Sequence, residues 1–179
     1  FGRNKRGINY LSRRGLADME ALQHFRVGLV DGTLKEKLSK AQLQKARRLG
    51  LINARGNEKF YNRIVVPILD PDGRAVGLYG RDITGKSQVA HLYLAGGHRA
   101  VWNGAAAAAY PEELVCAESI LDALSIWIGG ARKNVIAAYG ARGWTKHHTA
   151  LVRKANTRKL VLAYDADEAG QERARELAA

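Results

Sequence analysis

The sequence predicts an α/β protein in which an α+β N-terminal lobe of helices and antiparallel strands precedes a parallel sheet with helices. After residue 110, short apolar runs alternate with helical patterns, which is typical of βαβ units. Before residue 110, two strand-like runs meet at the turn signal PDG at 71–73, which is typical of an antiparallel hairpin. We therefore expect two domains, residues 1–109 and residues 110–179.

In the N-terminal lobe we expect two helices and three strands. Leu22 and Phe25 can share one apolar face of the first helix, and Ser39 and Gly50 supply a cap and a stop for the second. Residues 27–33 hold two glycines and are expected to form a loop. The expected elements are helices at 17–25 and 39–49 and strands at 61–70, 74–83 and 89–94.

In the second domain, each expected strand is followed by an expected helix. Five consecutive alanines at 105–109 form either a linker or a short helix at its entry. Cys116 is the one cysteine of the chain, so an internal disulfide is excluded, and its apolar neighbours indicate a small core residue. The expected strands are 113–117, 135–138 and 159–164, and the expected helices are 119–129, 145–154 and 168–178.

Charge is the most informative part of the composition. The chain carries 29 Lys and Arg against 17 Asp and Glu, which gives a net charge of +12. An excess of this size predicts attraction to a polyanion, and we favour nucleic acid over the alternative that the charge serves solubility alone. No apolar run approaches the length of a membrane span, so we expect no membrane partner and a cytoplasmic location.

The stretch LVLAYDADEAG at 160–170 carries the strongest chemical signal. If the strand extends to Asp167, then Asp165 and Asp167 stand on one face at its carboxyl end, where open α/β sheets place their ligands. Paired carboxylates without nearby His or Cys suit Mg²⁺ or Mn²⁺. In the alternative interpretation, Asp167 only caps the following helix and Asp165 is a solvated loop residue.

A second acidic element favours the metal interpretation. Glu118 ends the first expected strand of the parallel sheet, and Asp122 follows one helical turn later. Three or four carboxylates would then converge from two strand ends, and a cation would relieve their repulsion. Alternatively, Glu118 and Asp122 are ordinary first-turn acids that the helix dipole favours.

Glu118 to Asp122, followed by the DAD sequence at 165–167 and Gly170, resembles the Toprim domain. That fold is shared by bacterial primases, type IA and type II topoisomerases, some nucleases and recombination proteins, and the resemblance implies a Rossmann-like parallel sheet whose carboxylates bind Mg²⁺. Three further segments resemble bacterial-type, DnaG-like DNA primases, so that the resemblance covers nearly the whole chain. They are the hairpin at 61–83, YLSRRGL at 10–16 and YGARGWTKHHTALVRKA at 139–155.

The resemblance implies roles for eight residues. The catalytic residues would be Glu118, Asp122, Asp165 and Asp167, of which Glu118, Asp165 and Asp167 would bind the metal. The residues that bind nucleic acid or nucleotide would be Arg63, Arg81, His91 and Arg99. The sequence departs from the family at Ser119, where glycine is usual, and at His91, where lysine is common. The chain also ends before a third acidic motif and has no Cys/His cluster for a zinc-binding domain, so we expect part of a catalytic core.

The implied activity is that of a nucleotidyltransferase. A DNA primase would use Mg²⁺ (or Mn²⁺) and NTPs to synthesise a short RNA primer on a single-stranded DNA template, at the replication fork beside a replicative helicase. The alternatives are another Toprim enzyme, a nuclease or topoisomerase, and a non-catalytic nucleic-acid-binding module of a replication or mobile-element protein. Salt-dependent binding without metal dependence would favour the binding module.

Two further groups of residues have simpler interpretations. Neighbouring positions on a helix point about 100° apart, so His147 and His148 are expected to be surface polar residues and not joint zinc ligands. Tyr139 and Trp144 could stack on a base, but packing against the following helix is the favoured interpretation.

Overall fold

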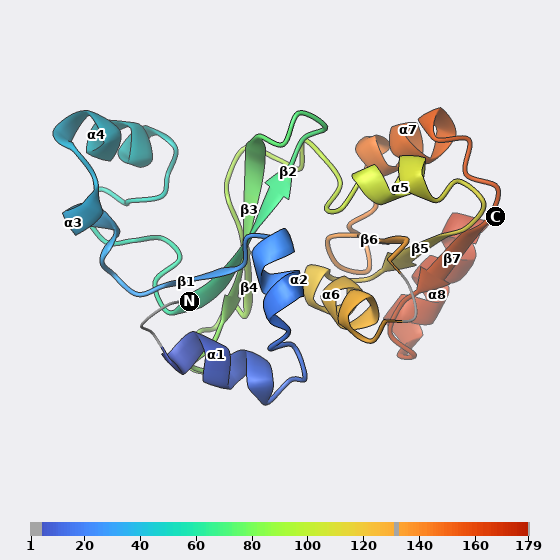
Figure 1. The fold of residues 1–179 in the computed structure, drawn as a ribbon, viewed down its shortest axis with the longest axis horizontal. Helices are drawn as coiled ribbons and strands as arrows, with labels where there is room; N and C mark the ends of the chain where they lie inside the picture. Colours follow the sequence, from blue (N-terminus) through green and yellow to red (C-terminus); the bar gives the residue numbers. More distant parts are fainter. Residues whose placement is uncertain (1–4, 131–132, 179) are drawn as a thin grey trace. The chain divides into compact units, whose positions relative to one another are not determined.

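The computed structural model describes residues 5–130 and 133–178 (Figure 1). The chain forms two compact units: one comprises Phe1–Pro67 and Gly77–Gly97, and the other comprises Ile68–Val76 and His98–Ala179. The predicted mixed α/β class is confirmed: the described residues form an antiparallel sheet and a parallel sheet. Within the described ranges, no helix combines the length and the apolar character needed to cross a lipid bilayer.

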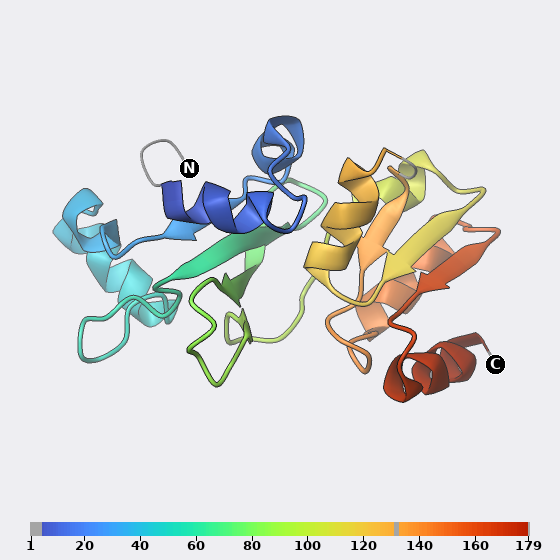
Figure 2. The ribbon, with the colours of Figure 1, turned by 90° about the horizontal axis from the view of Figure 1, so that it is seen from below.

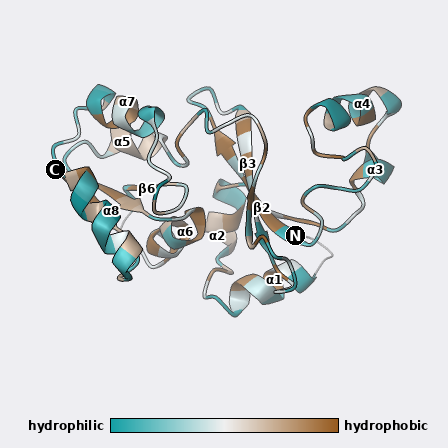
Figure 3. Cartoon of the chain, turned by 180° about the vertical axis from the view of Figure 1, so that it is seen from behind, coloured by the Kyte–Doolittle hydropathy of each residue, from teal (hydrophilic) through white to brown (hydrophobic). Residues whose placement is uncertain are grey.

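The first unit is built on an antiparallel sheet of order β1-β2-β3-β4. The far ends of β2 and β3, at the hairpin turn, are assigned to the second unit. The strands are β1 (Gly28–Val30), β2 (Arg63–Leu69), β3 (Ala75–Asp82) and β4 (His91–Tyr93), and the helices are α1 (Lys5–Ser12), α2 (Met19–His24), α3 (Leu34–Lys37) and α4 (Lys40–Arg48). Figure 3 shows hydrophilic residues over much of α3 and α4.

The prediction of a loop at 27–33 is wrong, because β1 pairs there with β2. Leu29 lies opposite Ile64, and Gly28 lies opposite Val65. A strand of three residues has too few positions to show alternation, and it is the partner strand that makes it extended. The helices α1 and α3 were also not among the expected elements.

The second unit contains a parallel sheet of order β6-β5-β7, whose strands run side by side in Figure 2. Cys116 in the central strand lies opposite Ile136 on one side and Leu162 on the other. The strands are β5 (Leu114–Ala117), β6 (Val135–Ala137) and β7 (Leu160–Ala163), and the helices are α5 (Ala105–Ala109), α6 (Ile120–Ile128), α7 (Lys146–Lys154) and α8 (Glu168–Ala178). The expected alternation of strands and helices is confirmed.

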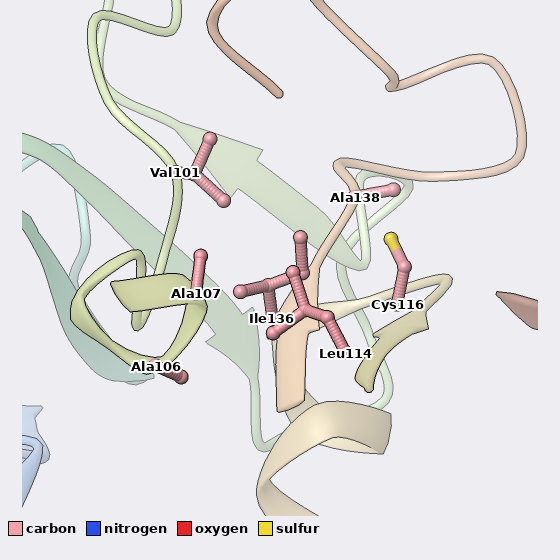
Figure 4. Packing of buried hydrophobic residues seen from close by; sticks show 7 residues of the cluster. All are labelled: Val101, Ala106, Ala107, Leu114, Cys116, Ile136 and Ala138. Carbon is pink, nitrogen blue, oxygen red and sulfur yellow. The ribbon is translucent and has the colours of Figure 1, made fainter. Parts of the chain in front are cut away.

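One core cluster of the second unit joins the sheet to residues in the segment 98–109, which explains why the two units divide near residue 98 and not near residue 110. Val101 and Ala107 pack against Leu114 and Ile136 (Figure 4). The five alanines therefore form a short helix, α5, in which small side chains allow close approach to the sheet. Cys116 is fully buried beside them, and burial raises the pKa of its thiol to about 12, as expected for a small core residue.

Candidate functional site

The carboxyl ends of β5 and β7 bring two acidic loops together. The two strands are parallel neighbours that end level with each other, with Ala117 opposite Ala163. Glu118 follows the first strand directly, and Asp165 follows the second after one residue. The backbone N–H of Asp165 donates a hydrogen bond to Oε2 of Glu118, with a donor–acceptor distance of 3.4 Å. The expected meeting of Glu118 and Asp165 at one sheet edge is therefore present.

The electrostatics of Glu118 reflect its acidic neighbours. Partial burial raises the pKa of its carboxyl, and the hydrogen bond from Asp165 opposes that rise. The negative charges of Asp165, Asp167 and Asp122 each raise the pKa further. The three aspartates thus lie within electrostatic range of Glu118, and a cation there would relieve the repulsion.

The two aspartates of the DAD sequence lie in a loop and not on a strand. Strand β7 ends at Ala163, within one residue of the expected end at 164, so the condition that it extends to Asp167 is not met. A strand lasts as long as its hydrogen-bonded partner, and β5 ends opposite Ala163. Asp167 does act as a helix cap, as one part of the alternative interpretation expects: its Oδ1 accepts a hydrogen bond of 2.7 Å from the backbone N–H of Gly170 in the first turn of α8.

Asp122 is held by the residue that departs from the family pattern. Ser119 caps α6, and its hydroxyl accepts from the backbone N–H of Asp122 at 3.4 Å. The same hydroxyl donates to Oδ2 of Asp122 at 2.5 Å. The Asp122 carboxylate therefore has one oxygen engaged inside the helix cap.

The donor set fits a hard cation in its chemistry and charge, although its side chains are not gathered around one point. Among residues 5–130 and 133–178, no group of three or more His, Cys, Asp or Glu side chains is arranged to hold a metal ion. The donors at the sheet edge are nevertheless all carboxylate oxygens, which Mg²⁺ and Mn²⁺ prefer. The metal-binding roles of Glu118, Asp165 and Asp167 remain predictions.

Arg63 lies inside the first unit. Arg63 is only 7% exposed. Its guanidinium donates to Oγ of Ser87 at 2.9 Å and to the carbonyl oxygen of Ala90 at 3.2 Å. Arg63 therefore holds the loop between β3 and β4. A residue that lines a nucleic-acid groove would be expected to be more exposed than this. Its predicted contact with nucleic acid remains a prediction, as does that of Arg99, which is exposed.

Arg81 and His91 are brought together by the register of the first sheet, in which they lie directly opposite each other on β3 and β4. Nη1 of Arg81 is hydrogen-bonded to Nε2 of His91, and Nε of Arg81 donates to the hydroxyl of Tyr10 at 3.1 Å. Nδ1 of His91 lies 3.0 Å from the hydroxyl of Tyr79. Sequence reasoning did not find Tyr10, because it is 71 residues from Arg81 and no local pattern marks it.

The loop after β6 is held by buried aromatic contacts. His148 is fully buried, so the expectation that it is a surface residue is wrong. Its Nδ1 accepts from the backbone N–H of Thr145 at 3.1 Å, and its Nε2 lies 3.0 Å from the carbonyl oxygen of Ala137, so it completes the cap of α7 as a neutral ring. Trp144 donates to Oγ1 of Thr149 at 3.0 Å, which confirms packing against the following helix.

Comparison with known families matches two successive segments of the chain. Residues 2–103 match the family described as the DNA primase catalytic core, N-terminal domain. Residues 115–179 match a Toprim-like family. The first match covers more than half of the chain.

Curated relatives match over most of the chain. The chain is 28% identical to the DNA primase of Helicobacter pylori over 178 residues, which covers 92% of this chain and 31% of that protein. It is 28% identical to the DNA primase of Haemophilus influenzae over 187 residues, covering 96% of this chain and 31% of the relative. The chain thus spans about a third of the length of these relatives.

Solved structures show the same fold. A DnaG catalytic core superimposes with a TM-score of 0.80 at 26% identity, over 96% of this chain and 58% of that one. The primase of Aquifex aeolicus, with its zinc-binding and RNA polymerase domains, gives a TM-score of 0.83 at 24% identity, over 97% of this chain and 46% of that one. A DnaG primase catalytic domain bound to ssDNA gives a TM-score of 0.74 at 24% identity, over 96% of this chain and 59% of that one.

Proposed function

Because the chain belongs to the DnaG-type DNA primase family, with the N-terminal domain of the catalytic core followed by a Toprim-like domain, we propose that it takes part in metal-dependent, template-directed synthesis of short RNA primers on single-stranded DNA. The observation that carries this proposal is the contact between Glu118 and the backbone of Asp165 at the carboxyl ends of two parallel strands. This contact brings two carboxylate-bearing loops to the same edge of the sheet, and metal-dependent nucleotidyl transfer uses metal ions that such carboxylates can hold.

Glu118, Asp165 and Asp167 are the residues that would hold Mg²⁺ or Mn²⁺, with Asp122 as a further acid nearby. When bound, the ion would supply the positive charge that activates a primer 3′-hydroxyl and neutralises the pyrophosphate leaving group. The chain's own contribution is to orient the ligands. The hydrogen bond between Asp165 and Glu118 aligns the two loops, and the bond from Gly170 fixes one oxygen of Asp167.

The partners follow from the same proposal. The net charge of +12 supports binding of a polyanionic template, and a related primase catalytic domain has been solved bound to ssDNA. We extend that binding to this chain, together with NTPs as substrates, an RNA primer as product and a replicative helicase as a partner at the replication fork. Arg81 and Arg99 are the residues proposed to bind phosphate groups.

The test is incorporation of labelled NTPs on a single-stranded template, with Glu118→Gln as the variant and Glu112→Gln as the matched control. Glu112 is an exposed acid before β5 that pairs with Arg158. We expect Mg²⁺-dependent RNA products from the wild type and the control, and at least a hundredfold fewer from Glu118→Gln. Salt-dependent binding without any product would contradict synthesis and favour the non-catalytic module. Shortened template strands would instead favour a Toprim nuclease.

A further inference from the structure

The hydrogen bonds around His91 determine its protonation state. An arginine side chain can only donate, so Nε2 of His91 must accept the bond from Nη1 of Arg81. A ring that accepts at Nε2 carries its proton on Nδ1, and this N–H then donates to the hydroxyl of Tyr79 across 3.0 Å. His91 is therefore a neutral ring with both nitrogens engaged, and it adds no positive charge to this face of the sheet.

The same contacts fix Arg81 from two sides. His91 lies opposite it on β4, and Tyr79 precedes it by two positions on the same strand, so all three side chains share one face of the sheet. From α1, the hydroxyl of Tyr10 accepts from Nε of Arg81 at 3.1 Å. Two of the five N–H groups of the guanidinium are thereby bound within the first unit. In the described part of the chain, the other three have no protein acceptor.

On the opposite face of the sheet, strand β3 packs closely against Phe60. Gly80, the neighbour of Arg81, lies over the ring of Phe60, and a Cβ atom there would overlap that ring. Strand β3 is therefore held against Phe60 on one face while Arg81 projects from the other.

We propose that Tyr10, His91 and Tyr79 are positioning residues that hold the guanidinium of Arg81 ready to bind a backbone phosphate of single-stranded nucleic acid. This inference rests on the proposed function and gives His91 a role different from the one the family resemblance implied. A guanidinium whose orientation is already fixed loses less conformational entropy when it binds a phosphate. His91 contributes through Arg81 and not as a cation of its own.

Binding is measured by fluorescence anisotropy with a labelled oligothymidylate over a range of salt concentrations. We expect Arg81→Gln to weaken binding about tenfold and to reduce the salt slope by about 0.7, since one phosphate contact is lost. Tyr10→Phe and His91→Ala should each weaken binding about threefold, and His91→Gln should recover most of the loss because its amide oxygen can accept. Tyr61→Phe, which removes an exposed hydroxyl of the same unit, is the matched control and should bind as the wild type does.

The double variants distinguish positioning from folding. In an Arg81→Gln background, Tyr10→Phe and His91→Ala should have no further effect, because both act through the arginine. Full additivity would overturn the inference, as would a His91→Gln variant that binds as weakly as His91→Ala.

Nitrogen NMR of the His91 ring tests the contacts themselves without DNA. At near-neutral pH we expect a neutral ring protonated at Nδ1, and a ring protonated at Nε2, or at both nitrogens, would overturn the inference. A wild-type chain that binds no single-stranded DNA while its ring shows the expected state would instead overturn the binding part of the proposed function.

Discussion

Gly170 allows the acidic loop to fold back over the first turn of α8. A Cβ atom at this position would overlap the carbonyl oxygen of Asp165 and press on the carboxylate of Asp167. We predict that Gly170→Ala lowers the free energy of unfolding by about 1–3 kcal/mol, because the loop must move away from the helix. Urea denaturation measures the loss.

The same variant tests the link between loop geometry and metal binding. Because the loop carries two of the predicted ligands, Gly170→Ala should also weaken Mn²⁺ binding, measured by electron paramagnetic resonance titration. Ala169→Ser, an exposed change in the same turn, is the control and should leave both quantities near the wild-type values. If Gly170→Ala is destabilised but binds Mn²⁺ as the wild type does, the geometry of this loop does not determine metal binding.

His148 makes the stability of the second unit depend on pH. Burial lowers the pKa of this ring below the ordinary value of 6.5, and burial lowers the pKa of the nearby His98 as well. In the unfolded chain the rings take up protons at a higher pH than in the folded chain, so stability is full above that ordinary value and falls on acidification. We predict a decreasing urea midpoint from about pH 7 to about pH 5.5.

The variant His148→Gln isolates the contribution of this ring. Its midpoint should be lower at neutral pH, because two hydrogen bonds inside the core are disturbed, and should change less on acidification than the wild-type midpoint. A wild-type midpoint that is constant or rises over this interval would contradict the assignment of a neutral, buried ring.

At the scale of elements, much of the second unit could be predicted because its signals are local. The helices expected at 119–129 and 145–154 do begin there, and Ser119 and Thr145 are their N-cap residues in the structure. The expected strand at 159–164 likewise ends within one residue of β7, whose last residue is Ala163. Strand β1 could not be predicted, because it exists only through its pairing with β2.

The capping box of α7 offers a direct measure of such a local signal. The Thr145 side chain accepts from the helix backbone while His148 accepts from the backbone N–H of Thr145. We predict that Thr145→Ala destabilises the chain by about 1 kcal/mol, as loss of an N-cap usually does. Thermal or urea unfolding checks this, with the exposed Lys146→Ala as the control. Equal stabilities of the two variants would argue against the cap.

At the scale of the whole molecule, the net charge of +12 predicts an affinity for single-stranded DNA that depends strongly on salt. For about three phosphate contacts, the binding constant should fall roughly ten- to twentyfold between ~50 and ~200 mM salt. Anisotropy titrations at four salt concentrations measure the slope. An affinity that is independent of salt would contradict a predominantly electrostatic interface.

Charge and spacing predict a kind of partner but not how each basic residue is used. Glu118 and Asp165 could be paired from the sequence because parallel strands place their carboxyl ends at one edge. The burial of Arg63 and the contact between Tyr10 and Arg81 could not, because both depend on tertiary packing between distant segments. The same limit applies to His91, whose neutral state follows only from its hydrogen bonds.

We propose that the carboxylates at the ends of β5 and β7 bind a divalent cation, and anomalous scattering from Mn²⁺-soaked crystals tests this binding most directly. The wild type should show a peak beside Glu118, Asp165 and Asp167, and crystals of Asp165→Ala should show none there. No peak at this edge of the wild-type sheet at millimolar Mn²⁺, or a peak that persists unchanged in Asp165→Ala, would contradict the claim.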